Sequence, residues 1–315
     1  MKKLAFFAGI LTATTGVFAL TLTVAPKANA VNVKAVDTVV IIDESGSMAG
    51  EQAWIQQVIP ALESALQAAG VGSGADANRY GLVGFGRSGS GTLGRSLTAN
   101  GNQFFSSSDF STAASGLVTS GGFEDGYSAI DFTLNNYSFR SGSEFGKNFI
   151  LVTDEDRDNG NGALTFQTTF NRLQNNGTLL NAVVNARFRD GNGTTALGID
   201  SKENAYLADG SGGFTRSTGG TAVFGSGSTI PDYVDLALDT GGAAWDLNQL
   251  RAGGNLAQSF TNGFIDIKVR EFVEPGVPSE PVPEPMTILG TLTAGAFGTQ
   301  FMRKRKQMKA AKSKA

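Results

Sequence analysis

The run Val36–Ile42 (V-D-T-V-V-I-I) constrains the fold of this chain more than any other feature. A nearly continuous set of β-branched residues is typical of a strand buried on both faces, as in a parallel sheet. The run continues into D-E-S-G-S, which places the carboxylate of Asp43 and the hydroxyls of Ser45 and Ser47 on one turn at the carboxyl end of that strand. We therefore expect a polar site at the edge of a parallel sheet.

Segments of helical and strand character alternate after this run. The hydrophobic spacing predicts, in order, a helix at 51–70, a strand at 80–85, a helix at 126–135, a strand at 148–153, a short helix at 166–173 and a strand at 179–188. Pro60 lies inside the first helix, where we expect a kink or an early end. This order predicts a doubly wound, mostly parallel α/β sheet with helices on both faces.

Residues 189–229 interrupt the alternation. They are rich in Gly, Ser, Thr and Asn and are longer than an ordinary connection, so we interpret them as an insertion with room for a hairpin. A helix at 230–238, an edge strand at 241–245 and a closing segment at 256–269 then complete one domain, which we place at 31–273.

Residues 1–30 are predicted to be a secretory signal peptide. Lys2 and Lys3 precede an apolar stretch, and Ala28-Asn29-Ala30 fits the small-residue rule for cleavage. The alternative is an N-terminal transmembrane helix. In the first case the body of the chain is exported.

A second targeting signal is predicted at the C-terminal end. Residues 274–285 hold five of the eight prolines and should form a stiff linker, 286–302 are apolar and just long enough to span a bilayer, and 303–315 are basic. The positive-inside rule places that basic tail in the cytoplasm. The order V-P-E-P, apolar segment, basic cluster at 282–306 resembles a bacterial PEP-CTERM sorting signal, which implies an exosortase of the inner membrane as a partner. A plain C-terminal membrane anchor is the alternative.

Composition excludes several function classes. The chain has no Cys and no His, so disulfides, His- or Cys-based zinc sites and Ser-His-Asp or Cys-His nucleophiles are excluded. The two ends carry three and seven Lys or Arg residues and no acidic residue, so residues 31–302 hold a net charge of −13 out of the total of −3. A body this acidic repels phosphates, which argues against nucleic acid as a partner.

Asp154 lies at the end of a second buried strand, in I-L-V-T-D-E-D-R-D. Ligands of open α/β sheets bind beyond the carboxyl ends of the strands, so Asp43 and Asp154 should face the same crevice. Oxygen ligands alone suit a hard divalent cation, Mg²⁺ or Ca²⁺. The alternative is a purely structural role, in which Ser45 and Ser47 only cap the following helix.

The D-x-S-x-S motif, the strand-end T-D and the segment G-G-F-E-D-G-Y resemble von Willebrand factor type A domains, which include integrin I domains. The resemblance implies a Rossmann-like fold and a metal-ion-dependent adhesion site (MIDAS). It implies that Ser45, Ser47 and Glu124 contact the ion directly, whereas Asp43 and Asp154 act through water and through the serines. One coordination position would stay open for an acidic group of a partner.

The third ligand departs from the usual family pattern. A Thr is expected after Gly-Gly, but this chain has Phe123 and then Glu124, as in the integrin β-subunit version. Glu124 is therefore the predicted ligand, with Thr119 and Asp125 as alternatives.

The acidic run after Asp154 is a candidate for a second calcium site. An EF-hand interpretation fails because the Gly comes one place late and Thr165 stands where a Glu is required. Asp156 and Asp158 remain either a weak second site or part of a solvated loop.

The leading hypothesis is an exported, surface- or matrix-associated adhesion module of a bacterium that binds an acidic protein or matrix ligand through its metal, without enzymatic activity. The second hypothesis is a structural envelope or biofilm matrix protein in which the metal only stabilises loops. A metal-dependent hydrolase ranks last, because no His or Cys can act as a general base.

Overall fold

The computed structural model describes residues 33–89 and 93–273 of the 315-residue chain. The predicted signal peptide (1–30), Pro-rich linker (274–285), apolar segment (286–302) and basic tail (303–315) lie outside these ranges and stay predictions. No helix within the described ranges is both long and apolar enough to cross a membrane.

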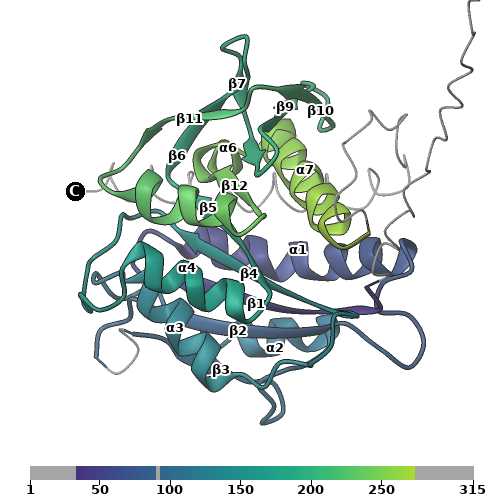
Figure 1. The fold of residues 1–315 in the computed structure, drawn as a ribbon, viewed down its shortest axis with the longest axis vertical. Helices are drawn as coiled ribbons and strands as arrows, with labels where there is room; N and C mark the ends of the chain where they lie inside the picture. Colours follow the sequence, from purple (N-terminus) through teal and green to yellow (C-terminus); the bar gives the residue numbers. More distant parts are fainter. Residues whose placement is uncertain (1–32, 90–92, 274–315) are drawn as a thin grey trace, which may run out of the picture. The chain divides into compact units, whose positions relative to one another are not determined.

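A nine-stranded sheet forms the centre of the fold (Figure 1). Strand β1 (Ala35–Asp43) pairs in parallel with β2 (Arg79–Phe85) on one side and with β4 (Phe145–Thr153) on the other. Beyond β4 the sheet continues with two more parallel strands, β5 (Thr178–Val184) and β12 (Ala243–Asp246). Three antiparallel strands then follow: β8 (Gly198–Asp200), β9 (Asn204–Ala208) and β10 (Phe214–Thr218). At the opposite edge, the antiparallel β3 (Arg95–Leu97) pairs with β2.

Helices cover both faces of this sheet, so the predicted α/β class is confirmed. One face holds α1 (Ala49–Ala68), α2 (Phe110–Ala114, after a 3₁₀ turn at Ser107–Asp109), α6 (Leu247–Arg251) and α7 (Gly254–Val273). The other holds α3 (Gly126–Asn136), α4 (Phe166–Asn175) and α5 (Asp235–Asp239), the last entered through a π-helical turn at Ile230–Val234. Figure 1 shows α1 beside α7, and α3 beside α4.

The residues of β1 divide between the two cores. Val36, Val40 and Ile42 pack in the cluster beneath α1 and α7, whereas Val39 and Ile41 pack in the cluster beneath α3. Because successive side chains of a strand point to opposite faces, a strand between two helical layers needs apolar residues on both. This explains why the run lacks polar alternation.

Of the two expectations at Pro60, a kink or an early end, the early end is wrong, since α1 continues to Ala68. Leu62 and Leu66, beyond the proline, are buried. At the other end of the helix, the ring of Trp54 packs edge-on against Phe260 and Phe264 of α7 at 5.7 and 5.3 Å. Burial of this apolar face on both sides of the proline outweighs one lost backbone hydrogen bond.

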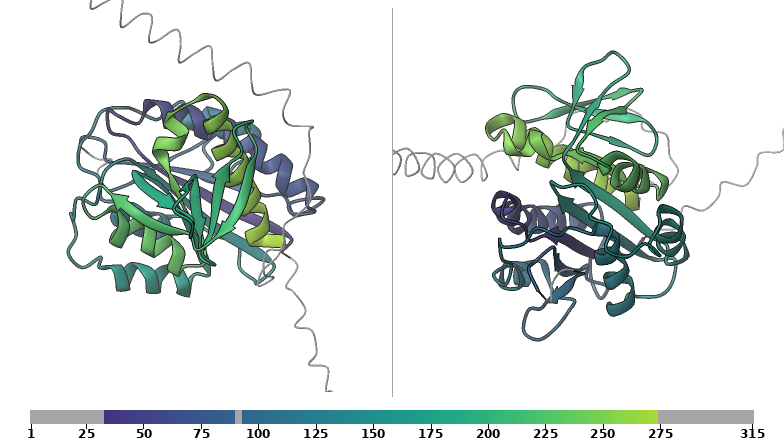
Figure 2. Two further views of the ribbon diagram at one scale, coloured as in Figure 1. Left: turned by 90° about the horizontal axis from the view of Figure 1, so that it is seen from above. Right: turned by 90° about the vertical axis from the view of Figure 1, so that its left-hand side faces the viewer.

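Two further expectations about the second half are corrected. The strand predicted at 179–188 is divided into β5 and β6 (Ala186–Arg189), and the strand predicted at the edge is internal, because β12 lies between β5 and β8. The predicted insertion contains the expected hairpin, because β9 pairs antiparallel with β10, and most of it extends the main sheet as β8–β10. The remainder, β7 (Thr195–Ala196) and β11 (Thr221–Gly225), flanks β6 in a separate three-stranded sheet, seen at the top of the right view in Figure 2.

Asp37 fixes the end of β1 that lies opposite the polar turn. Its side chain is fully buried and forms ion pairs with Arg79 and Arg140, each at 2.6 Å. Hydrogen bonds to these arginines hold the pKa of Asp37 below its usual value, against the effect of burial, which raises it. The carboxylate joins β1, β2 and the segment after α3.

Asp37→Asn is predicted to lower the free energy of unfolding at pH 7 by roughly 3 kcal/mol, because it leaves two arginines without their shared partner. Urea unfolding measures this. The matched control is Asp131→Asn, which removes the partly exposed Asp131–Arg172 pair and should cost under about 1 kcal/mol. Equal costs for the two variants would contradict the assignment of Asp37.

Candidate metal centre

Asp43, the last residue of β1, is fully buried at the carboxyl edge of the sheet. Its Oδ1 accepts the backbone N–H of Ser45 at 2.7 Å, and its Oδ2 accepts the hydroxyl of Thr153 at 3.0 Å. Thr153 is the last residue of β4, so Asp43 joins the ends of two adjacent parallel strands. The first bond also closes the turn that carries the serines.

Ser45 and Ser47 face each other, with their Oγ atoms 3.1 Å apart. Ser47 Oγ donates to Asp154 Oδ1 at 2.9 Å, which connects the first loop to the loop after β4. Neither serine caps α1, whose N-cap is Met48 without a side-chain bond. The capping interpretation is therefore wrong. The structure brings Asp43, Ser45, Ser47 and Asp154 together as the sequence predicts.

Glu124 reaches the same edge from the loop before α3 and is only 4% exposed. Gly86, at the end of β2, separates it from Asp43. A Cβ atom at Gly86 would lie 3.1 Å from Asp43 Oδ1 and 3.2 Å from Glu124 Cγ. With its φ of +78°, this position requires glycine. Both acidic side chains therefore lie next to the backbone of Gly86, where no side chain fills the space between them.

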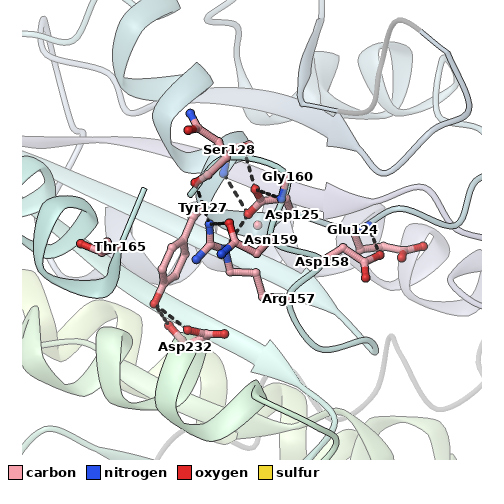
Figure 3. A network of polar contacts seen from close by, with 12 residues as sticks. Glu124, Asp125, Tyr127, Ser128, Arg157, Asp158, Asn159, Gly160, Thr165 and Asp232 are labelled. Atoms are coloured by element: carbon pink, nitrogen blue, oxygen red, sulfur yellow. Dashed lines mark hydrogen bonds and ion pairs between the residues drawn. The ribbon is translucent and has the colours of Figure 1, made fainter. Parts of the chain in front are cut away.

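Among the alternatives to Glu124, Asp125 is engaged elsewhere (Figure 3). Its carboxylate pairs with Arg157 at 2.8 Å and accepts the Ser128 hydroxyl and the Gly160 N–H, so it caps α3 and anchors the 154–160 loop. The other alternative, Thr119, has an exposed side chain. Glu124 remains the candidate that fits best.

Asp156 and Asp158 stabilise the acidic loop itself. Asp156 Oδ2 accepts the N–H of Ser228, and Asp158 Oδ2 accepts the N–H of Glu124 at 3.0 Å, while the Asp158 N–H donates to the Glu124 carbonyl at 2.9 Å. Figure 3 shows Asp158 beside Glu124. These bonds favour the loop interpretation over a second calcium site.

Sequence reasoning missed Glu44, which positions the loop that leads to Glu124. Its buried carboxylate pairs with Arg95 and accepts the Val118 N–H at 2.9 Å, and its backbone carbonyl accepts the N–H of Ser120 at 2.8 Å. Arg95 also donates to the Gly116 carbonyl. Its position directly after Asp43 in the motif was the only sequence signal, because the partners are about 50 to 75 residues away.

Arg251, at the end of α6, was also missed. Its Nη2 donates to Asp154 Oδ2 at 2.8 Å and its Nε donates to Glu51 Oε1 at 2.7 Å. The guanidinium therefore joins the loop after β4 to the first turn of α1. Nothing in the local sequence around Arg251 connects it with the D-x-S-x-S motif.

Asp43 and Glu124 differ from the neighbouring acids in their electrostatics. Glu44, Asp125 and Asp154 each pair with an arginine, whereas none of the ion pairs within residues 33–89 and 93–273 involves Asp43 or Glu124. Burial, with a smaller effect of the charge on Asp154, raises the pKa of Asp43 to about 6. Burial and then the charges of Asp43 and Asp158 raise the pKa of Glu124 to about 8.

These residues fit a divalent cation. Buried carboxylates need a positive partner or must bind a proton, and a cation beside Asp43 and Glu124 supplies that partner. Within the described ranges no three His, Cys, Asp or Glu side chains by themselves form a metal-binding group. The candidate centre therefore depends on the hydroxyls of Ser45 and Ser47, and Asp154 acts on it through Ser47.

The comparison with known families gives the class of the segment that carries these residues. Residues 37–183 match the von Willebrand factor type A domain, a class of mostly non-enzymatic binding modules. The match runs from β1 to β5 and includes all five predicted ligands. No curated protein matches the chain.

Solved structures of this class overlap with part of the chain. Proximal thread matrix protein 1 from the mussel byssus is 18% identical, covering 49% of this chain and 38% of its own, with a TM-score of 0.36. A von Willebrand factor type A protein from Catenulispora acidiphila is 18% identical, covering 48% and 33%, with a TM-score of 0.34. A further structure of the mussel protein, at 18% identity, 48% and 38% coverage and a TM-score of 0.35, is described as having a zinc occupied MIDAS motif. The matched region thus spans less than two fifths of each of these chains.

Glu124→Gln is predicted to change how stability depends on pH in the presence of a chelator. The folded state holds the Glu124 proton up to about pH 8, whereas the unfolded chain loses it near its ordinary pKa of about 4.5, so unfolding releases a proton between these values. Wild-type stability should therefore decrease as pH rises from about 5 to 8, by at most about 1.4 kcal/mol per pH unit from this group.

The glutamine variant should lose that part of the slope. Urea midpoints across this pH range measure the effect. Parallel curves for the two proteins would contradict a buried, proton-binding Glu124.

Proposed function

We propose that this chain is a binding module that captures an acidic partner through a Mg²⁺ or Ca²⁺ ion at a MIDAS-type centre. The observation that carries the proposal is a pair of buried carboxylates, Asp43 and Glu124, beside two facing serine hydroxyls. In the part of the chain that the structure describes, neither carboxylate has an arginine partner. A bound cation supplies positive charge to both acids and a Lewis-acidic position for a partner's carboxylate.

The roles of the residues follow from their contacts. Ser45, Ser47 and Glu124 would hold the ion. Asp43 orients the first loop through the Ser45 N–H, and Asp154 orients the Ser47 hydroxyl. The all-oxygen donor set favours Mg²⁺ or Ca²⁺ over Zn²⁺, which prefers sites with nitrogen or sulfur.

The setting we propose is the bacterial cell envelope, surface or extracellular matrix. The predicted signal peptide and PEP-CTERM-like segment would direct export, exosortase recognition and at least temporary attachment to the inner membrane through residues 286–302. The acidic body argues against nucleic acid as a partner. We propose no enzymatic activity, because the chain has no His or Cys that could act as a general base.

Titration calorimetry and thermal unfolding of the full chain with Mg²⁺, Ca²⁺ and Zn²⁺ test cation binding. Mg²⁺ or Ca²⁺ at one hundred times its dissociation constant should stabilise the wild-type fold by about 2.7 kcal/mol. Asp43→Ala should remove this gain while keeping the circular dichroism spectrum. Absence of both heat and stabilisation with every ion would overturn the proposal.

Capture of an acidic partner separates adhesion from a purely structural metal. Beads that carry glutamate side chains should retain the Mg²⁺-loaded protein, and beads that carry glutamine should not. Ser47→Ala and added chelator should each abolish retention. Stabilisation by the cation without selective retention would favour the structural matrix hypothesis instead.

A further inference from the structure

Arg251 lies between two acidic side chains at the edge of the candidate centre. Its side chain is one-third exposed, whereas Glu51 and Asp154 are 3% and 8% exposed. Besides these two pairs, its Nη2 lies 3.4 Å from the carbonyl oxygen of Ser47. The guanidinium therefore contacts the metal-binding loop at two points. One is the backbone carbonyl of Ser47, and the other is the Asp154 carboxylate, which accepts the Ser47 hydroxyl.

The edge of the sheet carries more negative charge than a divalent cation neutralises. Six carboxylates lie there with at most 8% exposure. Glu44 and Asp125 each have their own arginine, which leaves Asp43, Glu51, Glu124 and Asp154. One of them, Glu124, stands where the usual family pattern has a neutral Thr. Each further unpaired charge in this set strengthens cation binding and weakens the attraction of the loaded centre for a second anion.

We propose that Arg251 is the charge-compensating residue of this centre, which keeps the bound cation exchangeable and the loaded centre attractive to an acidic group. The proposal rests on the function proposed above. The positive charge of Arg251 is permanent at physiological pH, so the compensation does not depend on a proton. Its contact with Asp154 Oδ2 also leaves Oδ1 free to accept the Ser47 hydroxyl.

The proposal predicts opposite changes in two measurements. Removal of the charge in Arg251→Gln should tighten Mg²⁺ and Ca²⁺ binding roughly three- to tenfold at low salt, because Glu51 and Asp154 then lack their counter-ion. The same variant, saturated with Mg²⁺, should bind glutamate-bearing beads roughly three- to tenfold more weakly. Both differences should shrink as the salt concentration rises.

Two control variants test whether the charge of Arg251 causes the changes in metal and bead binding. Arg251→Lys keeps the charge and should leave both measurements within about twofold of wild type. If the bridging of Glu51 and Asp154 by one guanidinium mattered rather than the charge, the lysine variant would change as much as Arg251→Gln. Arg172→Gln removes a partly exposed arginine of the Asp131 pair on α4 and should change neither measurement.

Titration calorimetry with each metal and a bead-retention series on the full-length variants test the proposal. Tighter metal binding together with weaker bead binding in Arg251→Gln supports it. A fall in both would identify Arg251 as structural support and overturn it, and so would no change in either. If wild type itself binds no cation, the proposed function fails first, so the two failures are distinguishable.

Discussion

The parallel pairing of β1 with both β2 and β4 determines where every candidate ligand lies. In this register Asp43 is opposite Phe85, and Ile42 is opposite Val152, so the three strands end at the same edge of the sheet. Asp43 and Thr153 are then close enough to bond, and Gly86 directly follows β2 beside them. A one-residue slip would move the apolar side chains of β1 to the wrong core and separate these groups, so packing of the two cores also holds the centre together.

The loops at this edge are held by a set of buried acids that each have an arginine. Glu44 with Arg95 fixes the loop before α3, Asp125 with Arg157 fixes the loop after β4, and Asp154 with Arg251 connects that loop to α6. Single removals of such partners are costly because they leave a buried charge uncompensated. The loops are therefore organised before any ligand arrives, which reduces the entropy that binding must overcome. Asp43 and Glu124, which have no such partner among residues 33–89 and 93–273, are the buried acids left for a cation.

The predicted strands and helices agree with the structure where the hydrophobic pattern was clear in the local sequence. The runs at 36–42, 80–85, 126–135 and 148–153 correspond to β1, β2, α3 and β4. The errors lie where tertiary contacts outweighed a local signal. Packing against Phe260 and Phe264 carries α1 through Pro60, and β8 places β12 inside the sheet although its short sequence resembles an edge strand.

The sequence by itself determined the class of fold, because burial on both faces of a parallel strand requires consecutive apolar residues, which form a local pattern. It also determined the polar groups at two strand ends, because D-x-S-x-S and T-D directly follow two of these runs. Only the tertiary structure decided which acids are compensated. Arg95, Arg157 and Arg251 reach their partners from 51, 32 and 97 residues away, and no local pattern records such distances. It also decided that Glu124 rather than Asp125 is available. Both are acidic and adjacent, but the carboxylate of Asp125 is already bound by Arg157, the Ser128 hydroxyl and the Gly160 N–H.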